Sequence, residues 1–325
     1  MNGIKKLKIL TFNWHTPYIE SLAKTGHQFD IVNFNNSTDG SVGWNFSQRP
    51  LPLNINFISS ASELFEKLKN KFYDLSICFT ELELQVINEF TYLPVIFFAL
   101  NSLSVIAESQ DDKFIFKEQV LNFLSKRKSI FATPSKLKLK DWGIDGLIIA
   151  SGIDVNDYYS YTGEIDSILT VGNLIKERKF IFDYNSLMEI SKDFPYRIVG
   201  YNPQIKNSRK SKNWEELKRF YQKNRVYLHS TLNNMEDGFN LSLLEAMASG
   251  MPIVSTYNKS SPIINGENGF ISDDINYLRE KIKLLLNDKN LALEFGKKAK
   301  DTVTKDFSIK SFIDNWNKAF YLSLD

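Results

Sequence analysis

Two carboxylates and one glycine stand close together in this 325-residue chain, in a stretch that combines two kinds of chemistry. Asp237 directly precedes Gly238, and Glu245 follows about two helical turns later, on a helix predicted from about Asn240 to Ala248. The start of a helix offers unpaired N–H groups and a positive dipole end, and a glycine lets an anion approach the backbone. Carboxylates instead accept hydrogen bonds from sugar hydroxyls.

The elements around this stretch form one unit of an open α/β sheet. An apolar strand over 226–228 leads through a polar turn into the helix, which ends at Ser249-Gly250, and a second apolar strand follows over 253–255. In such sheets, ligands bind outside the carboxyl ends of the strands. Taken alone, the same residues also fit an amphipathic helix with an Asp near its start.

The whole run DGFNLSLLEAMASGMPIVST resembles the donor-binding motif of retaining glycosyltransferases of the GT-B fold, family 4 or "group 1", which reads EGFGLxxLEAMAxGxPVVxS. Glu245 matches the second Glu of that motif, whereas Asp237 replaces the first Glu and Asn240 a Gly. The resemblance implies that Glu245 holds the donor ribose and that Asp237 contacts the donor sugar. It also implies that the N–H groups of Gly238, Phe239, Asn240 and Leu241 stabilise the diphosphate.

Two turns further upstream resemble the rest of the family's donor site. The segment VGNLIKERK over 171–179 is similar to VGRLxxxKG, whose Arg and Lys clamp the diphosphate, and GYNP over 200–203 is similar to a turn near the base. Arg178 occupies the Lys position and Asn173 the Arg position. The resemblance makes donor-binding candidates of Gly172, Asn173, Lys176, Arg178, Lys179, Gly200 and Asn202.

The first half of the chain begins with a strand over Lys8–Phe12, a helix over Tyr18–Thr25 and a strand over Phe29–Phe34. The family usually has a Gly-rich turn after the first strand, but here the turn is NWHTP and contains no glycine. His15 and Trp14 lie at the carboxyl end of that strand. We expect either that they reach a ligand, with His15 as a third catalytic candidate beside Asp237 and Arg178, or that they are buried in the turn.

Weaker candidates for acceptor binding follow in the same half. Trp44 and Arg49 belong to a Gly-, Ser- and Pro-rich loop over Gly40–Pro52, and Asn101 stands where the family often has a His. His27 is expected to be structural, and His229 either contacts a ligand or is structural.

Bulk properties exclude several functions. The net charge of +2 gives no electrostatic argument for nucleic acid, and the single cysteine, Cys78, lies in an apolar run that favours burial. No metal-ligand spacing occurs, the N-terminus fits a first strand rather than a signal peptide, and no window is apolar enough to span a membrane. We therefore expect a soluble cytoplasmic protein. Six basic residues offer either a solvated helix face or peripheral contact with the inner membrane surface, namely Lys126, Arg127, Lys128, Lys136, Lys138 and Lys140.

Together, length and resemblance predict an α/β protein with two Rossmann-like doubly wound domains that face each other across a cleft, the GT-B fold. The predicted boundaries are 1–163 for the acceptor domain, 164–307 for the donor domain, and 308–325 for a terminal helix that crosses back to the first domain.

The resemblance implies a retaining glycosyltransferase that uses a UDP- or GDP-sugar, without a required metal or other cofactor. The implied acceptor is a saccharide or a lipid-linked molecule, in polysaccharide, lipopolysaccharide or glycolipid assembly. Two alternatives stay open: a non-catalytic nucleotide-sugar-binding protein, favoured by Asn173 and Asp237, and a GT-B epimerase. A dinucleotide oxidoreductase is disfavoured because no GxGxxG follows the first strand.

Overall fold

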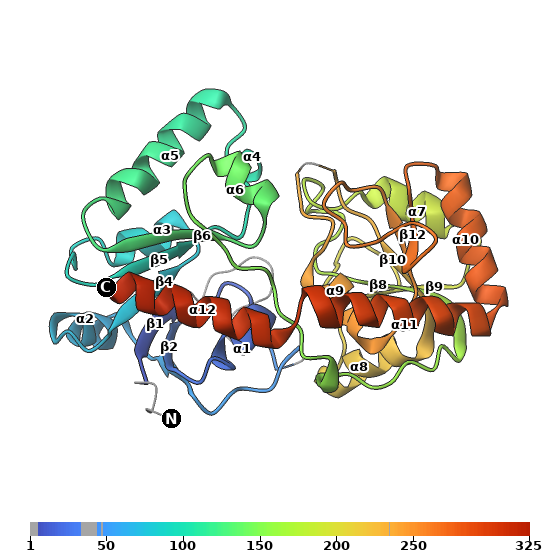
Figure 1. Ribbon diagram of the computed structural model, residues 1–325, viewed down its shortest axis with the longest axis horizontal. Helices are drawn as coiled ribbons and strands as arrows, with labels where there is room; N and C mark the ends of the chain where they lie inside the picture. The colour runs from blue at the N-terminus through green and yellow to red at the C-terminus, as the bar shows by residue number, and fades with distance from the viewer. Residues whose placement is uncertain (1–5, 34–43, 47, 234) are drawn as a thin grey trace. The chain divides into compact units, whose positions relative to one another are not determined.

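The computed structural model divides the chain into two compact units (Figure 1). Unit 1 comprises residues 1–45, 49–151 and 310–325, and unit 2 comprises residues 46–48 and 152–309. The structure describes residues 6–33, 44–46, 48–233 and 235–325, so the predicted strand end at Phe34 and the loop residues 40–43 and 47 lie outside the described part. In that part, no helix is long and apolar enough to cross a membrane.

Unit 1 is built on a parallel sheet of seven strands in the order β3-β2-β1-β4-β5-β6-β7. The central strands β4 and β5 are buried along their whole length, as their unbroken apolar runs predict. The elements are β1 Lys8–Phe12, α1 Thr16–Ala23, β2 Gln28–Val32, β3 Ile55–Ile58, α2 Ala61–Lys69, β4 Leu75–Cys78, α3 Glu81–Val86, β5 Val95–Phe98, α4 Leu103–Ile106, α5 Gln110–Leu124, β6 Ser129–Thr133, α6 Lys136–Trp142, β7 Leu147–Ile148 and α12 Ile309–Leu324.

The last helix of the chain, α12, packs on unit 1 beside α1 (Figure 1). Trp316 is fully buried, and its Nε1 donates a hydrogen bond to the Tyr18 hydroxyl at 3.2 Å. His27 is buried between the start of β1 and helix α12. Its Nδ1 accepts a hydrogen bond from the Leu7 N–H, and its Nε2 lies 3.0 Å from Asn317 Oδ1. These contacts give His27 the structural role that the sequence indicated.

Unit 2 holds a second parallel sheet, of five strands in the order β12-β11-β10-β8-β9. Apolar side chains from its helices cover both faces of the sheet in two separate clusters. The elements are the short 3-10 helix η1 Val155–Asp157, β8 Ile165–Val171, α7 Tyr184–Ser191, β9 Tyr196–Val199, α8 Trp214–Lys223, β10 Asn224–His229, α9 Leu241–Ser249, β11 Ile253–Thr256, β12 Gly269–Ser272, α10 Ile275–Asn287 and α11 Lys289–Asp306.

The division between the units falls between 151 and 152, whereas the sequence placed it between 163 and 164. The reason is local packing of the intervening segment. Ile153 exchanges backbone hydrogen bonds with Phe307 and Ile309, and Tyr158 is buried in the core of unit 2 against Tyr221. The polar segment 152–163 therefore packs on unit 2 and is not a linker between the units.

One helix starts earlier than its sequence pattern indicated. Helix α5 begins at Gln110, although only 117–126 was expected. The Ser109 side chain accepts from the Asp112 N–H and caps the helix, and acidic residues in the first turn suit the positive end of its dipole. The added residues 110–116 include the exposed apolar residues Phe114 and Ile115.

Candidate functional site

The candidate donor site lies at the carboxyl ends of β8 and β10 in unit 2. These strands are neighbours, but the chain leaves β8 toward β9 on one side and leaves β10 through α9 toward β11 on the other. Such a reversal of strand order opens a crevice where ligands bind in open α/β sheets. The two connections that flank it, 172–183 and 230–240, contain most of the donor-binding residues predicted from the sequence.

Helix α9 is well defined at both of its ends. The Asn240 side chain accepts from the Leu243 N–H at 2.9 Å, and Gly250 ends the helix in the left-handed conformation with φ of 90°. This cap satisfies the Leu243 N–H. The N–H groups of Leu241 and Ser242 also belong to the first turn, where no carbonyl of the helix precedes them by four residues to accept their hydrogen bonds. The start of α9 therefore keeps the features that attract an anion.

Gly238 makes a close contact with another turn that the sequence did not indicate. Its N–H donates to Ser260 Oγ at 2.8 Å, and a Cβ at this position would lie 2.6 Å from the Ser261 nitrogen. The close approach that requires glycine is therefore made by the turn of the chain over 260–261. Phosphate contact through the Gly238 N–H, expected from the sequence, would require the bond to Ser260 to break.

The two carboxylates of the motif are both buried. Asp237 is 2% exposed and Glu245 is 4% exposed. Glu245 Oε2 accepts a hydrogen bond from the Tyr221 hydroxyl at 2.8 Å, and the Asp237 N–H donates to Glu236 Oε1 at 2.8 Å. Sequence reasoning missed Tyr221 and Glu236. Glu236 could have been found from its place beside Asp237, but Tyr221 belongs to an earlier helix and carries no local signal.

The turn after β8 is tied to the turn after β9 by two asparagines. Asn202 Oδ1 accepts from the Ile175 N–H at 2.8 Å, and its Nδ2 donates to the Gly172 carbonyl at 2.9 Å. Asn173 Oδ1 accepts from the Tyr201 N–H at 2.8 Å. These predicted donor-binding side chains are brought together, but their bonds hold the two turns in place.

Gly200 is needed where these two turns meet. Its φ is 141°, and an added Cβ would lie 2.0 Å from the Gly172 carbonyl oxygen. A side chain at this position would push the turn that contains Asn173 away from the turn that contains Asn202. The glycine therefore lets the two connections pack directly on one another.

The basic residues of the β8 turn differ in exposure. Lys176 and Lys179 are exposed, while Arg178 is partly buried with its guanidinium 5.6 Å from the centroid of the Phe182 ring. Between them, Glu177 buries both carboxylate oxygens, and neither has a hydrogen-bond partner in the described part of the chain. The turn therefore carries two exposed ammonium groups beside one partly buried guanidinium, a set that suits a diphosphate.

In unit 1, the structure separates the predicted acceptor residues into two groups. His15 and Trp14 lie at the carboxyl end of β1, partly exposed, with ring centroids 6.2 Å apart. Trp44 is buried and donates to the Arg49 carbonyl at 3.0 Å, and Arg49 is also buried. Trp44 thus bonds within its own loop, whereas the Arg49 guanidinium lies 3.5 Å from the Glu20 carboxylate of α1. Asn101 is partly exposed, and its carbonyl accepts from the indole of Trp142.

Three of the six basic residues considered for membrane contact are buried or bonded to other parts of unit 1. Arg127 donates to the carbonyls of Ile87 and Phe90, Lys128 reaches the last two carbonyls of the chain, and Lys138 is buried. Lys128 nevertheless stays exposed, so burial of Lys138 and partial burial of Arg127 are what make the basic surface smaller than the sequence indicated.

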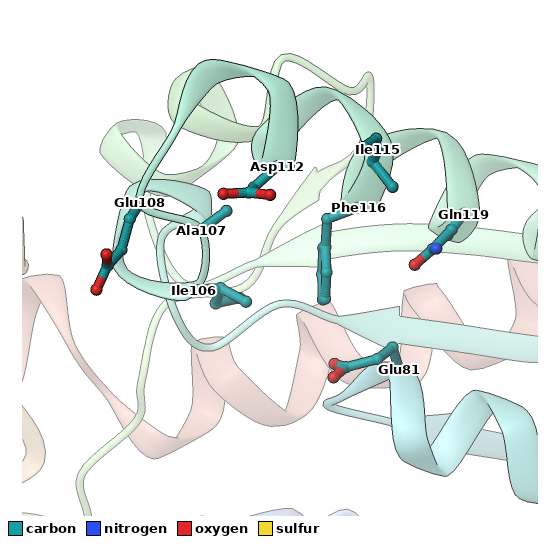
Figure 2. Close-up of a pocket in the computed structure, with 8 residues that line it drawn as sticks. All are labelled: Glu81, Ile106, Ala107, Glu108, Asp112, Ile115, Phe116 and Gln119. Atoms are coloured by element: carbon teal, nitrogen blue, oxygen red, sulfur yellow. The ribbon is translucent and has the colours of Figure 1, made fainter.

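Unit 1 also contains a groove of about 500 Å³ beside α5 (Figure 2). Figure 2 shows Asp112 and Phe116 on α5 and Glu81 at the start of α3, with their side chains directed toward the space between these elements. None of the four acceptor candidates of the sequence lines it. The complete lining is Glu81, Ile106, Ala107, Glu108, Asp112, Ile115, Phe116 and Gln119.

His229 is fully enclosed at the end of β10, where burial lowers its pKa to about 4. Its Nε2 lies 3.5 Å from the Thr231 hydroxyl. Cys78 is buried as a free thiol, as its apolar surroundings predicted. Among the described residues, no group of three or more His, Cys, Asp or Glu side chains could hold a metal ion.

Solved structures define the class of fold to which this chain belongs. HepE from Anabaena, crystallised with UDP and glucose, superposes with a TM-score of 0.69 over 97% of this chain and 99% of that one, at 13% identity. Sucrose-phosphate synthase from Thermosynechococcus elongatus gives a TM-score of 0.66 over 97% and 98% of the two chains, also at 13% identity. The chain therefore has the GT-B fold predicted from its sequence.

Sequence comparison adds a family match over part of the chain. Residues 200–302, which contain Asp237 and Glu245, match the model of the family described as glycosyl transferases group 1. The match confirms the group 1 resemblance that the motif indicated.

Curated relatives align over limited regions. The poly(ribitol-phosphate) alpha-N-acetylglucosaminyltransferase of Staphylococcus aureus is 35% identical over 89 residues, which are 26% of this chain and 18% of that protein. An uncharacterized glycosyltransferase of Haemophilus influenzae is 28% identical over 176 residues, 47% of this chain and 48% of that protein. The chain thus spans less than half the length of these curated relatives.

Proposed function

We propose that this chain is a retaining glycosyltransferase that moves a sugar from a nucleotide-diphosphate sugar to a saccharide acceptor. The observation that carries the proposal is the position of Asp237 and Glu245. Both are buried carboxylates in the segment that matches the group 1 family: Asp237 lies in the turn before α9, and Glu245 lies within that helix. A buried carboxylate needs hydrogen-bond donors, and sugar hydroxyls supply them.

Each part of the site then has a chemical task. Glu245 binds the ribose hydroxyls of the donor, and Asp237 contacts the donor sugar. Charge develops on the diphosphate as it leaves, and Arg178, Lys176 or Lys179, and the first N–H groups of α9 stabilise it. We propose UDP as the nucleotide before GDP, because the similar HepE structure holds UDP.

The acceptor side of the proposal rests on unit 1. His15 and Trp14 lie at the carboxyl end of β1, a position where ligands bind in open α/β sheets. The indole offers a face for sugar C–H groups, and the imidazole offers a hydrogen bond to a hydroxyl. We propose a saccharide or lipid-linked acceptor in the assembly of a polysaccharide or glycolipid.

A thermal-shift screen of UDP, GDP, ADP and their sugar conjugates tests the donor site. A nucleotide at one hundred times its Kd should stabilise the protein by about 2.7 kcal/mol, and Glu245→Ala should remove most of that shift. Glu267→Ala is the matched control, because Glu267 is exposed on the same unit and should leave the shift unchanged. Failure of every nucleotide to stabilise wild type would contradict the proposal.

A non-catalytic nucleotide-sugar-binding protein is the second candidate. It is favoured by Asn173, which replaces the diphosphate-binding Arg of the family motif. The Asn173 side-chain oxygen accepts a hydrogen bond from the Tyr201 N–H. The two functions differ in turnover. An NMR assay with the stabilising UDP-sugar should reveal released UDP in the presence of saccharide acceptors, with the anomeric configuration of the donor kept in the product. Tight binding without turnover, even by hydrolysis, would favour the second candidate.

A further inference from the structure

Glu245, the residue assigned to the donor ribose, is held by a tyrosine from another helix. Tyr221 lies near the end of α8, is fully buried, and directs its hydroxyl to Glu245 Oε2 at 2.8 Å. Hydrogen bonds to a charged group contribute more than bonds between neutral groups, and they fix the acceptor in one orientation. The orientation of the Glu245 carboxylate therefore depends on a residue outside the connections that flank the site.

The Tyr221 ring is itself held in place by other aromatic rings. The Tyr227 ring lies 6.2 Å away, and the Tyr158 ring is perpendicular at 6.3 Å, measured between centroids. Tyr158 belongs to the segment 152–163, which precedes β8, and Tyr227 is on β10 in the sheet. The hydroxyl is thus presented from a rigid aromatic cluster with little freedom to move away from Glu245.

The hydroxyl remains a donor at all physiological pH values. Burial, and after it the nearby Glu245 charge, raises the pKa of Tyr221 well above its usual value. A protonated phenol has one hydrogen to donate, and a carboxylate offers about four acceptor positions, so one bond from Tyr221 does not exhaust Glu245.

We propose that Tyr221 is a positioning residue for donor recognition: it fixes the Glu245 carboxylate in the orientation that accepts hydrogen bonds from the two ribose hydroxyls. The proposal rests on the donor site proposed above, and it adds a residue of α8 to the specificity for ribose. Loss of the Tyr221 hydroxyl should weaken the contribution of the ribose hydroxyls and leave the diphosphate contacts in place.

Calorimetric titration with UDP and 2′,3′-dideoxy-UDP tests this, because the two ligands differ only in the ribose hydroxyls. In wild type, dideoxy-UDP should bind at least about tenfold more weakly than UDP. Tyr221→Phe keeps the ring between its neighbours, removes the hydroxyl, and should lower that ratio at least about threefold. Glu245→Ala should bring the ratio close to one.

Tyr227→Phe is the matched control, since it makes the same substitution on the adjacent ring, whose hydroxyl lies 3.4 Å from the Val171 carbonyl. It should keep the wild-type ratio whatever its effect on melting temperature. A general loss of stability would weaken both ligands together and leave the ratio unchanged. In a Glu245→Gln background, Tyr221→Phe should cause much less change in the ratio, because the charged acceptor is already gone.

The outcomes separate this proposal from the donor site itself. An unchanged or larger ratio in Tyr221→Phe, with a wild-type ratio well above one, would overturn the positioning role alone. A wild-type ratio of one would overturn the assignment of Glu245 to the ribose, and the positioning role would fall with it. Absence of UDP binding to wild type would overturn UDP as the donor nucleotide and Tyr221 as its positioning residue.

Discussion

At the scale of single residues, burial of polar groups is the property that organises the candidate site. Asp237, Glu245 and His229 are all nearly inaccessible to solvent. A buried ionisable group must either find partners or stay neutral. Glu245 obtains a phenol donor from Tyr221, whereas burial keeps His229 neutral by lowering its pKa to about 4. The Glu245 carboxylate thus has a hydrogen-bond donor within unit 2, whereas His229 is packed as a neutral ring at the strand end.

His229 should make stability depend on pH. Its folded-state pKa of about 4 is below its usual value of 6.5, so between these values the unfolded chain binds the additional proton. Its contribution is therefore complete above pH 6.5 and is lost as the pH falls to 4. This loss amounts to about 3 kcal/mol of unfolding free energy.

Urea unfolding of wild type and His229→Gln at pH 7 and pH 4.5 isolates this effect. The variant should be less stable at pH 7, and the difference between the two proteins should shrink at pH 4.5. A comparison of two proteins is needed because the buried Glu83 carboxyl, with its pKa raised by burial to about 8, contributes stability that is lost as the pH rises. A difference that is the same at both pH values would contradict a neutral, buried His229.

At the scale of elements, the donor-side turns form one connected structure. The turns after β8 and β9 are joined by Asn202 and Asn173 and meet at Gly200. Loops carry function when a rigid scaffold positions them, and here the asparagine bonds supply that rigidity. The basic residues Lys176, Arg178 and Lys179 thus belong to a turn that is held by these bonds, so we expect only their side chains to adjust to a diphosphate.

Asn202→Ala should separate these two turns. The Ile175 N–H and the Gly172 carbonyl would each lose their bond to the side chain, which should cost about 2 kcal/mol of unfolding free energy. Nucleotide binding should also weaken, because the turn that contains Arg178 would lose the two bonds that hold it. Asn290→Ala, an exposed change in the first turn of α11, should alter neither quantity much. Guanidinium unfolding and UDP titration measure both, and wild-type values for Asn202→Ala would contradict the interpretation.

At the scale of the whole molecule, the chain forms two parallel sheets, and its last helix belongs to the first of them. Trp316 and Phe320 on α12 are fully buried, and Trp316 packs on Phe98 of β5 at 5.1 Å between centroids. The first and last segments of the chain thus share one core. The candidate donor residues are all in unit 2, so we expect that a change in the core of unit 1 leaves them in place.

Trp316→Ala should weaken unit 1 by about 3–5 kcal/mol, the usual cost of removing a buried large aromatic side chain. Hydrogen exchange followed by mass spectrometry should show faster exchange in β1, β5 and α12. The peptides of β10 and α9 should keep their protection and their response to UDP. Leu322→Ala is the control on the same helix, because Leu322 is 47% exposed. Equal loss of protection in both units would contradict separate cores.

The sequence alone was sufficient for the order and type of most elements and for the resemblance of the segment around Asp237 and Glu245 to group 1 glycosyltransferases. Unbroken apolar runs predicted the buried strands β4 and β5, and the end signals of α9 placed that helix within a residue at each end. These features depend on local patterns, in which periodicity and capping residues act over a few positions.

Only the tertiary structure decided which polar groups meet. The Tyr221–Glu245 bond joins residues 24 apart in sequence, and the bond from Gly238 to Ser260 joins residues 22 apart. The burial of Trp44 and Arg49 and the placement of 152–163 with unit 2 likewise depend on packing between distant segments. A motif specifies residue types at local spacing, whereas hydrogen-bond partners and burial are set by how the sheet brings its helices and turns together. For that reason Glu245 was identified from the sequence, but the tyrosine that holds it was not.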